Sequence, residues 1–338
     1  SYQQISSKLI KKKITLQSLQ SETFIDNHLK KDIIKLTKCR KVVFKTGSTA
    51  FTIFIHYRNE SLDKFIEILM YTLSFVSMLS DHTIKDIKIN YYLLDVKRVL
   101  DGDFIFDKEE VNGGACSYTD SNSEITVWRK EEILKVSIHE LIHGLQYDYK
   151  NDNSEIIQHY QQKYGIMSPK MNTFEAYTEI YAELLHCYLL SRFCKQVYEK
   201  INQYDLFASN VGIEIEFSKL QSSKVITLLE KNKDVNKETN VTAYYLIKTE
   251  LFSDIKNFLQ FCLQSNKDII KLTKYRTVQF KTGLTTFTLD IHYKNENLDL
   301  LIDTTLSTIF ILVLIFKLLY LFNKYNNIYY IILILILL

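Results

Sequence analysis

The chain has 338 residues, of which 46% are apolar and 24% charged, and its formal net charge is +3. This is the composition of a globular protein rather than a disordered one, and the length suits one large domain or two ordinary ones. The small net charge, without a basic motif, argues against nucleic acid as a partner. Five cysteines at irregular spacing, with no CxxC pair, indicate free thiols in a reducing, intracellular compartment.

The chain begins with strand-forming segments and becomes helical after them. Residues 1–30 are basic but lack the apolar core of a signal peptide, and we interpret them as an N-terminal extension. A helix is expected from Ser61 to about Leu79. Runs of β-forming residues predict five strands, at Arg40–Lys45, Thr49–Tyr57, Asp86–Leu94, Val111–Tyr118 and Glu124–Arg129. Strands first and helices afterwards predict an α+β domain with a mixed sheet lobe and a mainly helical lobe.

The helix predicted over Glu131–Tyr147 contains the sequence HELIH. Its two histidines, His139 and His143, are four residues apart and therefore neighbours on one helix face, where they can bind the same Zn²⁺. Glu140 points in an adjacent direction and can reach a water on the metal without being a ligand. The alternative is a helix with two solvated histidines and an acid between them.

A second helix, expected over Asn172–Leu190, offers a third ligand. Its acidic residues recur on one face together with a histidine, at Glu175, Glu179, Glu183 and His186. Such a face on an otherwise apolar helix suits a position opposite the histidine helix. The alternative reading makes Glu175 the N3 residue of a capping box with Asn172.

These motifs resemble those of the HExxH zinc peptidases. VSIHELIHGL is similar to their extended motif, and EAYTE, from Glu175 to Glu179, resembles the Glu-x-x-Ser-Asp of thermolysin-like gluzincins. The resemblance implies a zincin-like fold, with Glu175 as the third ligand and Glu179 as the acid that holds a ligand histidine; Glu179 as the ligand is the alternative. The chain departs from the family in having Phe174 before Glu175. The run from Arg129 to Glu140 also resembles HExxH proteins coded by large DNA viruses.

The resemblance implies zinc-dependent hydrolysis of a peptide or protein substrate. Glu140 would act as the general base, and one tyrosine of a helix expected over Thr239–Phe252 would be the oxyanion donor, either Tyr244 or Tyr245, of which Tyr245 is preferred. The strand residues Gly113, Gly114 and Ala115 could pair with an extended substrate peptide. Two alternatives remain open: a non-catalytic zinc-stabilised binding protein tethered to a membrane, and a partly degraded duplicate gene product.

The C-terminal part of the chain contains a duplication and an apolar tail. Lys31–Asp63 returns as Lys267–Asp299 with 24 of 33 residues identical and no gap. We therefore predict a zincin-like domain over residues 31–262, a partial duplicate of residues 31–67 over residues 263–303, and a tail over residues 304–338. The apolar stretches within residues 306–338 are slightly short for a bilayer and are interrupted by Lys317. They indicate either membrane association through an anchor or an extension with no selected role.

Overall fold

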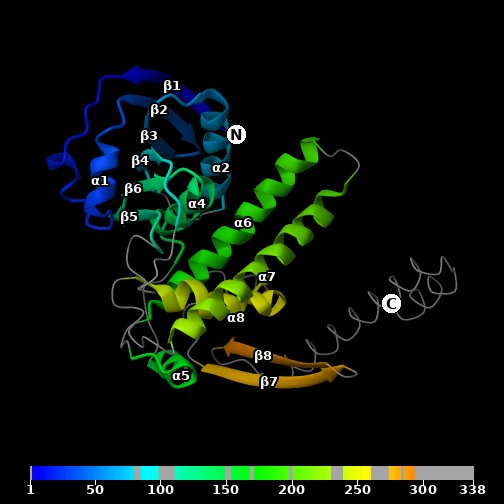
Figure 1. The fold of residues 1–338 in the computed structure, drawn as a ribbon. Helices are drawn as coiled ribbons and strands as arrows, with labels where there is room; N and C mark the ends of the chain where they lie inside the picture. Colours follow the sequence, from blue (N-terminus) through cyan, green and yellow to red (C-terminus); the bar gives the residue numbers. More distant parts are fainter. Residues whose placement is uncertain are drawn as a thin grey trace. The chain divides into compact units, whose positions relative to one another are not determined.

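The computed structural model describes residues 2–79, 84–98, 111–148, 154–167, 171–197, 201–229, 239–259, 274–282 and 285–293. These residues belong to two compact units, Ser1–Ser253 and Asp254–Leu338. The predicted α+β class is confirmed: the first unit contains an open mixed sheet, and most of its helices follow the last strand (Figure 1).

The sheet of the first unit has six strands in the order β1-β2-β3-β4-β6-β5. Strands β3, β4 and β6 are parallel neighbours, whereas β1–β2, β2–β3 and β5–β6 pair antiparallel. Their bounds are Gln3–Ile10 for β1, Lys38–Thr46 for β2, Thr49–Tyr57 for β3, Asp86–Leu94 for β4, Gly114–Tyr118 for β5 and Asn122–Arg129 for β6. All five predicted strands are therefore present, and the short β5 forms one edge of the sheet.

Strand β1 was not predicted, because residues 1–30 were interpreted as an extension. It pairs with β2 at the other edge of the sheet, and all its residues are exposed or half-buried. Since neither face of the strand is buried, its sequence QQISSKLI does not alternate cleanly between apolar and polar residues. Pairing with β2, rather than side-chain patterning, holds this strand in place.

Helices cover both faces of the sheet (Figure 1). Helices α2 (Asp63–Ser77) and α4 (Ile133–Gly144) belong to the largest apolar cluster, together with β2, β3 and β4. On the opposite face, the 3-10 helix η1 (Gln17–Leu19) and helix α1 (Asn27–Ile33) pack around Trp128. Tyr91 and Leu93 of β4 belong to the first cluster and Tyr92 and Leu94 to the second, so burial on both faces explains the consecutive apolar residues at the end of this strand.

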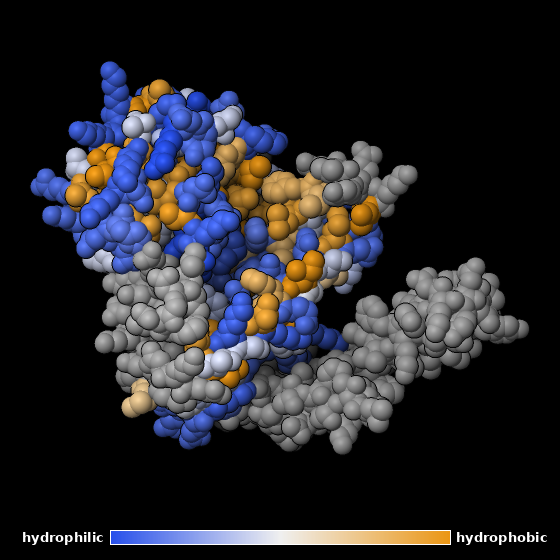
Figure 2. All heavy atoms as spheres, viewed as in Figure 1, coloured by the Kyte–Doolittle hydropathy of each residue, from blue (hydrophilic) through white to orange (hydrophobic). Residues whose placement is uncertain are grey.

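The helical part contains α5 (Ser154–Tyr164), α6 (Thr173–Val197), α7 (Gln203–Leu229), the π-helix η2 (Thr242–Ile247) and α8 (Lys248–Ser253). Helix α6 packs against α7 and also against α4, so it joins the helices to the sheet. Apolar surface is visible over the two long helices in Figure 2. The exposed apolar residues of α7 include Ile213, Phe217, Leu220 and Ile226.

The second unit contains a hairpin of β7 (Lys274–Thr282) and β8 (Thr285–Tyr293). It is the predicted copy of β2–β3, and its register is the same, with Phe280 opposite Phe287 as Phe44 is opposite Phe51. Within the described part of the chain, no helix combines the length and the apolarity needed to cross a membrane. The predicted tail, residues 304–338, lies outside the described residues, as does the predicted domain boundary at residue 262.

Candidate metal centre

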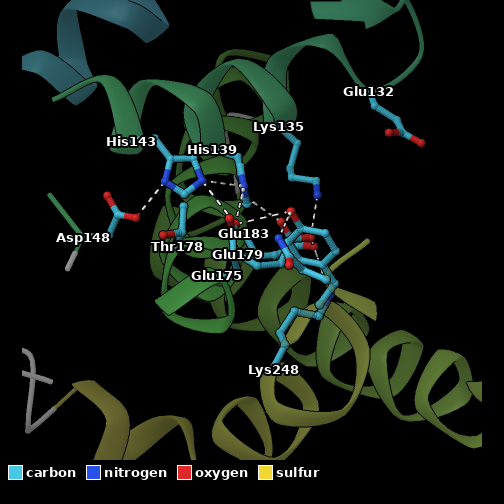
Figure 3. Close-up of polar contacts among 12 residues, drawn as sticks. Glu132, Lys135, His139, His143, Asp148, Glu175, Thr178, Glu179, Glu183 and Lys248 are labelled. Carbon is cyan, nitrogen blue, oxygen red and sulfur yellow. Dashed lines mark hydrogen bonds and ion pairs between the residues drawn. The ribbon is translucent and has the colours of Figure 1, made fainter. Parts of the chain in front are cut away.

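The centre lies where helix α4 crosses helix α6 (Figure 3). Helix α4 covers most of the predicted segment, and all residues from Val136 to Gly144 are buried. Its face with Ile138, Leu141 and Ile142 packs on the sheet cluster. The histidines are on the side of the helix turned toward α6, and the acidic residues of α6 point back at them, as expected from the spacing of both sets.

Three ligand atoms converge between these helices: Nε2 of His139, Nε2 of His143 and Oε2 of Glu175. The two nitrogens are 3.1 Å apart, and the carboxylate oxygen is 3.3 Å from His139 Nε2 and 3.2 Å from His143 Nε2. Ligands about 2.0–2.1 Å from a tetrahedral zinc ion are separated by about 3.3–3.4 Å. The edges of the triangle are therefore close in length to those between ligands of a zinc ion.

A carboxylate lies next to the Nδ1 atom of each histidine. Asp148 Oδ2 is 2.7 Å from His143 Nδ1, and Glu179 Oε2 is 2.9 Å from His139 Nδ1, although the second contact lacks the angle of a straight hydrogen bond. Since a carboxylate only accepts, each neighbour favours the tautomer that carries its proton on Nδ1. Both Nε2 lone pairs then face the Glu175 carboxylate, an arrangement of acceptors that a proton or a metal cation between them can satisfy.

The buried carboxylates of the cluster also favour positive charge on or between the two histidines. Burial by itself would lower the pKa of His139, but its contacts with Glu175 and Glu179 raise that pKa to about 9. Burial likewise opposes ionisation of Glu175, yet His143 and His139 hold its pKa well below the usual range. In the absence of a metal, protons on the histidines balance the carboxylates; a divalent cation can replace them.

Two lysines support the acidic face of α6 from either side. Lys135 Nζ is 2.6 Å from Glu179 Oε1, and Lys248 Nζ is 3.4 Å from Glu183 Oε1 and 4.0 Å from Glu179 Oε1. Glu179 therefore links His139 to two ammonium groups. These pairs fix the carboxylate that orients the histidine, so the predicted supporting position of Glu179 agrees with its contacts.

Glu140 lies beside the three ligand atoms without contributing one. It is buried, and burial raises its pKa, which His139 and His143 oppose. Its carboxylate lies against the backbone of Gly114: a Cβ on Gly114 would be 2.6 Å from Glu140 Oε1 and 2.7 Å from Val136 Cγ1. Because Gly114 has no side chain, the Glu140 carboxylate can lie against the backbone of β5 at this position. This close approach accounts for a glycine in an edge strand.

A cavity of about 600 Å³ opens beside the centre. His139, Glu140 and the predicted substrate-binding residues Gly113 and Gly114 line it, whereas Ala115 packs on the Trp128 side of the sheet. Alternation along β5 separates Gly114 from Ala115, because successive residues face opposite sides of a strand, whereas Gly113 precedes the strand.

Both tyrosines of η2 line this cavity as well. Tyr244 Oη donates to Glu175 Oε2 at 3.3 Å, and its ring centroid is 5.9 Å from that of His139. Tyr245, which the sequence favoured as oxyanion donor, instead engages Arg98. The tyrosine nearest to the ligand atoms is therefore Tyr244.

Two features of the centre did not follow from the sequence. Asp148 meets His143 because α4 ends at Gly144 and Gln146 adopts a left-handed φ of 55°, which turns the chain back; no periodicity signals this. Asn172 Nδ2, directly before α6, donates to Asn240 Oδ1 at 2.6 Å. Lys135 could have been identified, since it precedes His139 by four residues on the same helix.

Comparison with protein-family models, with curated proteins and with solved structures gave no match for this chain.

Proposed function

We propose that the chain is a zinc-dependent peptidase in which His139, His143 and Glu175 hold the metal. One observation carries the proposal: two imidazole nitrogens and one carboxylate oxygen form a triangle with edges of 3.1–3.3 Å, within reach of one tetrahedral ion. Two histidines and a glutamate with a fourth position open are a donor set typical of catalytic zinc.

The arrangement of strands and helices around the centre also supports a zincin-like fold. The histidine helix α4 follows β6 and packs on it, and the antiparallel edge strand β5 lies along the same helix. Helix α6 then supplies the carboxylates from the helical part. This arrangement agrees with the gluzincin resemblance of the two motifs.

The residues of this chain then have separate roles. Zinc would supply an activated water and would polarise the scissile carbonyl. Glu140, buried beside the cavity, accepts the water proton and passes it to the leaving amine. Tyr244, rather than Tyr245, is the closer donor for the developing oxyanion. The edge of β5 near Gly113 and Gly114 offers backbone groups to an extended peptide.

The test combines metal content with hydrolysis. Wild-type protein should bind one zinc per chain, and His143→Ala should lose it. Glu140→Gln should keep zinc but lose cleavage of a diverse peptide library by about 10²–10⁴-fold. Equal, substoichiometric zinc in wild type and His143→Ala would refute the site. Full zinc binding without cleavage of any peptide would favour a non-catalytic zinc-stabilised protein.

A further inference from the structure

The cavity beside the metal centre extends away from the proposed ligands along helices α6 and α7. Each of these helices lines it with residues that recur every three or four positions, as residues on one helix face do. On α6 these are Glu179, Glu183 and His186, and on α7 they are Glu214, Phe217, Gln221 and Lys224. Because the two helices pack against each other, the two faces form one wall of the cavity.

Glu183 lies in this wall at a distance that a substrate on the metal can reach. It follows the proposed ligand Glu175 by eight residues, which places it about 12 Å further along the helix. Glu214 is its neighbour on α7, and the two carboxyl groups share a hydrogen bond. From a scissile carbonyl at the metal, this distance suits a long side chain of an adjacent residue or roughly three residues of extended chain.

The charges in this part of the cavity do not balance. Three carboxyl groups, those of Glu179, Glu183 and Glu214, meet the two ammonium groups of Lys135 and Lys248. Lys135 Nζ is 2.6 Å from Glu179 Oε1, and Lys248 Nζ is 3.4 Å from Glu183 Oε1 (Figure 3). Glu214 forms no ion pair with a lysine or arginine in the described part of the chain. One more positive charge would therefore complete this group.

An aromatic ring lies beside Glu214 on the same face of α7. Phe217 follows Glu214 by one helical turn and is 51% exposed, and both residues line the cavity. A lysine or arginine side chain combines an apolar stem with a charged head, so the stem can pack on the ring while the head meets the carboxylate. An acidic side chain at this position would instead add a fourth negative charge.

A proton takes the place of the missing cation when the cavity is empty. Burial and the neighbouring Glu183 raise the pKa of Glu214 to about 7, with Lys248 and Lys135 opposing. A cation that binds here leaves Glu214 ionised and paired, and the proton is released to the solvent.

We propose that the cavity holds a cationic group of the peptide substrate between Glu214 and Phe217. The group is an ammonium or a guanidinium, carried by a lysine or arginine side chain or by the free amino terminus of the substrate. Glu214 is the residue that determines this preference. The inference rests on the proposed peptidase function, which places the substrate beside the metal, and adds to it the class of substrate.

The test measures peptide binding in the Glu140→Gln variant, which lacks the proposed general base and so leaves the peptides intact. Capped octapeptides with one lysine, placed at each position in turn, are compared by isothermal titration calorimetry with the same peptides carrying norleucine. A third set carries norleucine and a free amino terminus. Glu214→Gln is then added to this background, and Glu216→Gln is the matched control, because Glu216 is an exposed acid of the same helix.

We expect the lysine peptide to bind at least about tenfold more tightly than its norleucine partner at one position, since hydrogen bonds between ionised groups are the stronger ones. Glu214→Gln should remove this difference, and Glu216→Gln should keep it. A gain in the third set that depends on Glu214 would assign the cation to the amino terminus.

Equal affinities in the three sets would overturn the inference, as would a preference that persists in Glu214→Gln or the absence of binding by every peptide. Zinc content and hydrolysis are measured separately in the wild-type protein. A protein that prefers lysine through Glu214 but cleaves nothing would refute the peptidase function alone, whereas cleavage without this preference would refute the cation site alone.

Discussion

The Nδ1 atom of His143 lies 2.7 Å from Oδ2 of Asp148, a buried residue five positions further along the chain. This carboxylate fixes the ring so that Nε2 faces His139 and Glu175. Partners of this kind typically contribute 10–100-fold to metal affinity. Asp148→Asn should therefore weaken zinc binding by about that factor, measured by competition with a chromogenic chelator. The exposed Asp120 gives a matched control, and an affinity of Asp148→Asn equal to that of Asp120→Asn would contradict this role.

Gly114→Ala should displace Glu140 while leaving the proposed zinc ligands in place. The added methyl group would be 2.6 Å from Glu140 Oε1, a distance at which the carboxylate or the strand must move. We expect peptide hydrolysis to fall about 100-fold or more with zinc content unchanged. Gly212, within α7, has open space where a Cβ would be added. Gly212→Ala should keep activity and raise the free energy of unfolding by about 0.5–1 kcal/mol. Equal activities of the two variants would show that Gly114 does not position Glu140.

Lys135→Met should destabilise the fold because it leaves Glu179 without its closest counter-charge. The two side chains are 2.6 Å apart and 19% and 10% exposed. Removing one partner of a buried pair typically costs about 3 kcal/mol or more, and the remaining exposure places this pair at the lower end. Urea unfolding of Lys135→Met, Glu179→Gln and the double variant measures the coupling. Strictly additive losses would mean that the pair contributes nothing to stability.

The stability of the zinc-free protein should decrease between about pH 5 and pH 7. Burial and the neighbouring Glu183 raise the pKa of Glu214 to about 7, with Lys248 and Lys135 opposing. In this range the folded state holds a proton that the unfolded state has released, so unfolding becomes easier as the pH rises through the folded pKa. Glu214→Gln should flatten this dependence in chemical unfolding at pH 5, 6, 7 and 8. An unchanged slope would show that Glu214 titrates normally.

The sequence alone determined the class of the fold and the core of the candidate centre. The five strands and the α4 and α6 helices followed from local patterning, because each buries one face against the core. His139 and His143 could be selected because helix geometry places residues four apart on one side. Glu140 and Glu175 were selected through the resemblance of their motifs to those of the HExxH zinc peptidases. Both copies of the hairpin were visible because sequence identity needs no structural context.

The tertiary structure decided which side chains meet between segments far apart in the chain. Strand β1 belongs to the sheet only because β2 offers it an edge. Asp148 reaches His143 through a left-handed turn at Gln146, and Tyr244 rather than Tyr245 faces Glu175 because the π-helix η2 sets the direction of each ring. These contacts depend on how the helices cross and where the loops run. The spacing of residues along one helix or strand does not specify either.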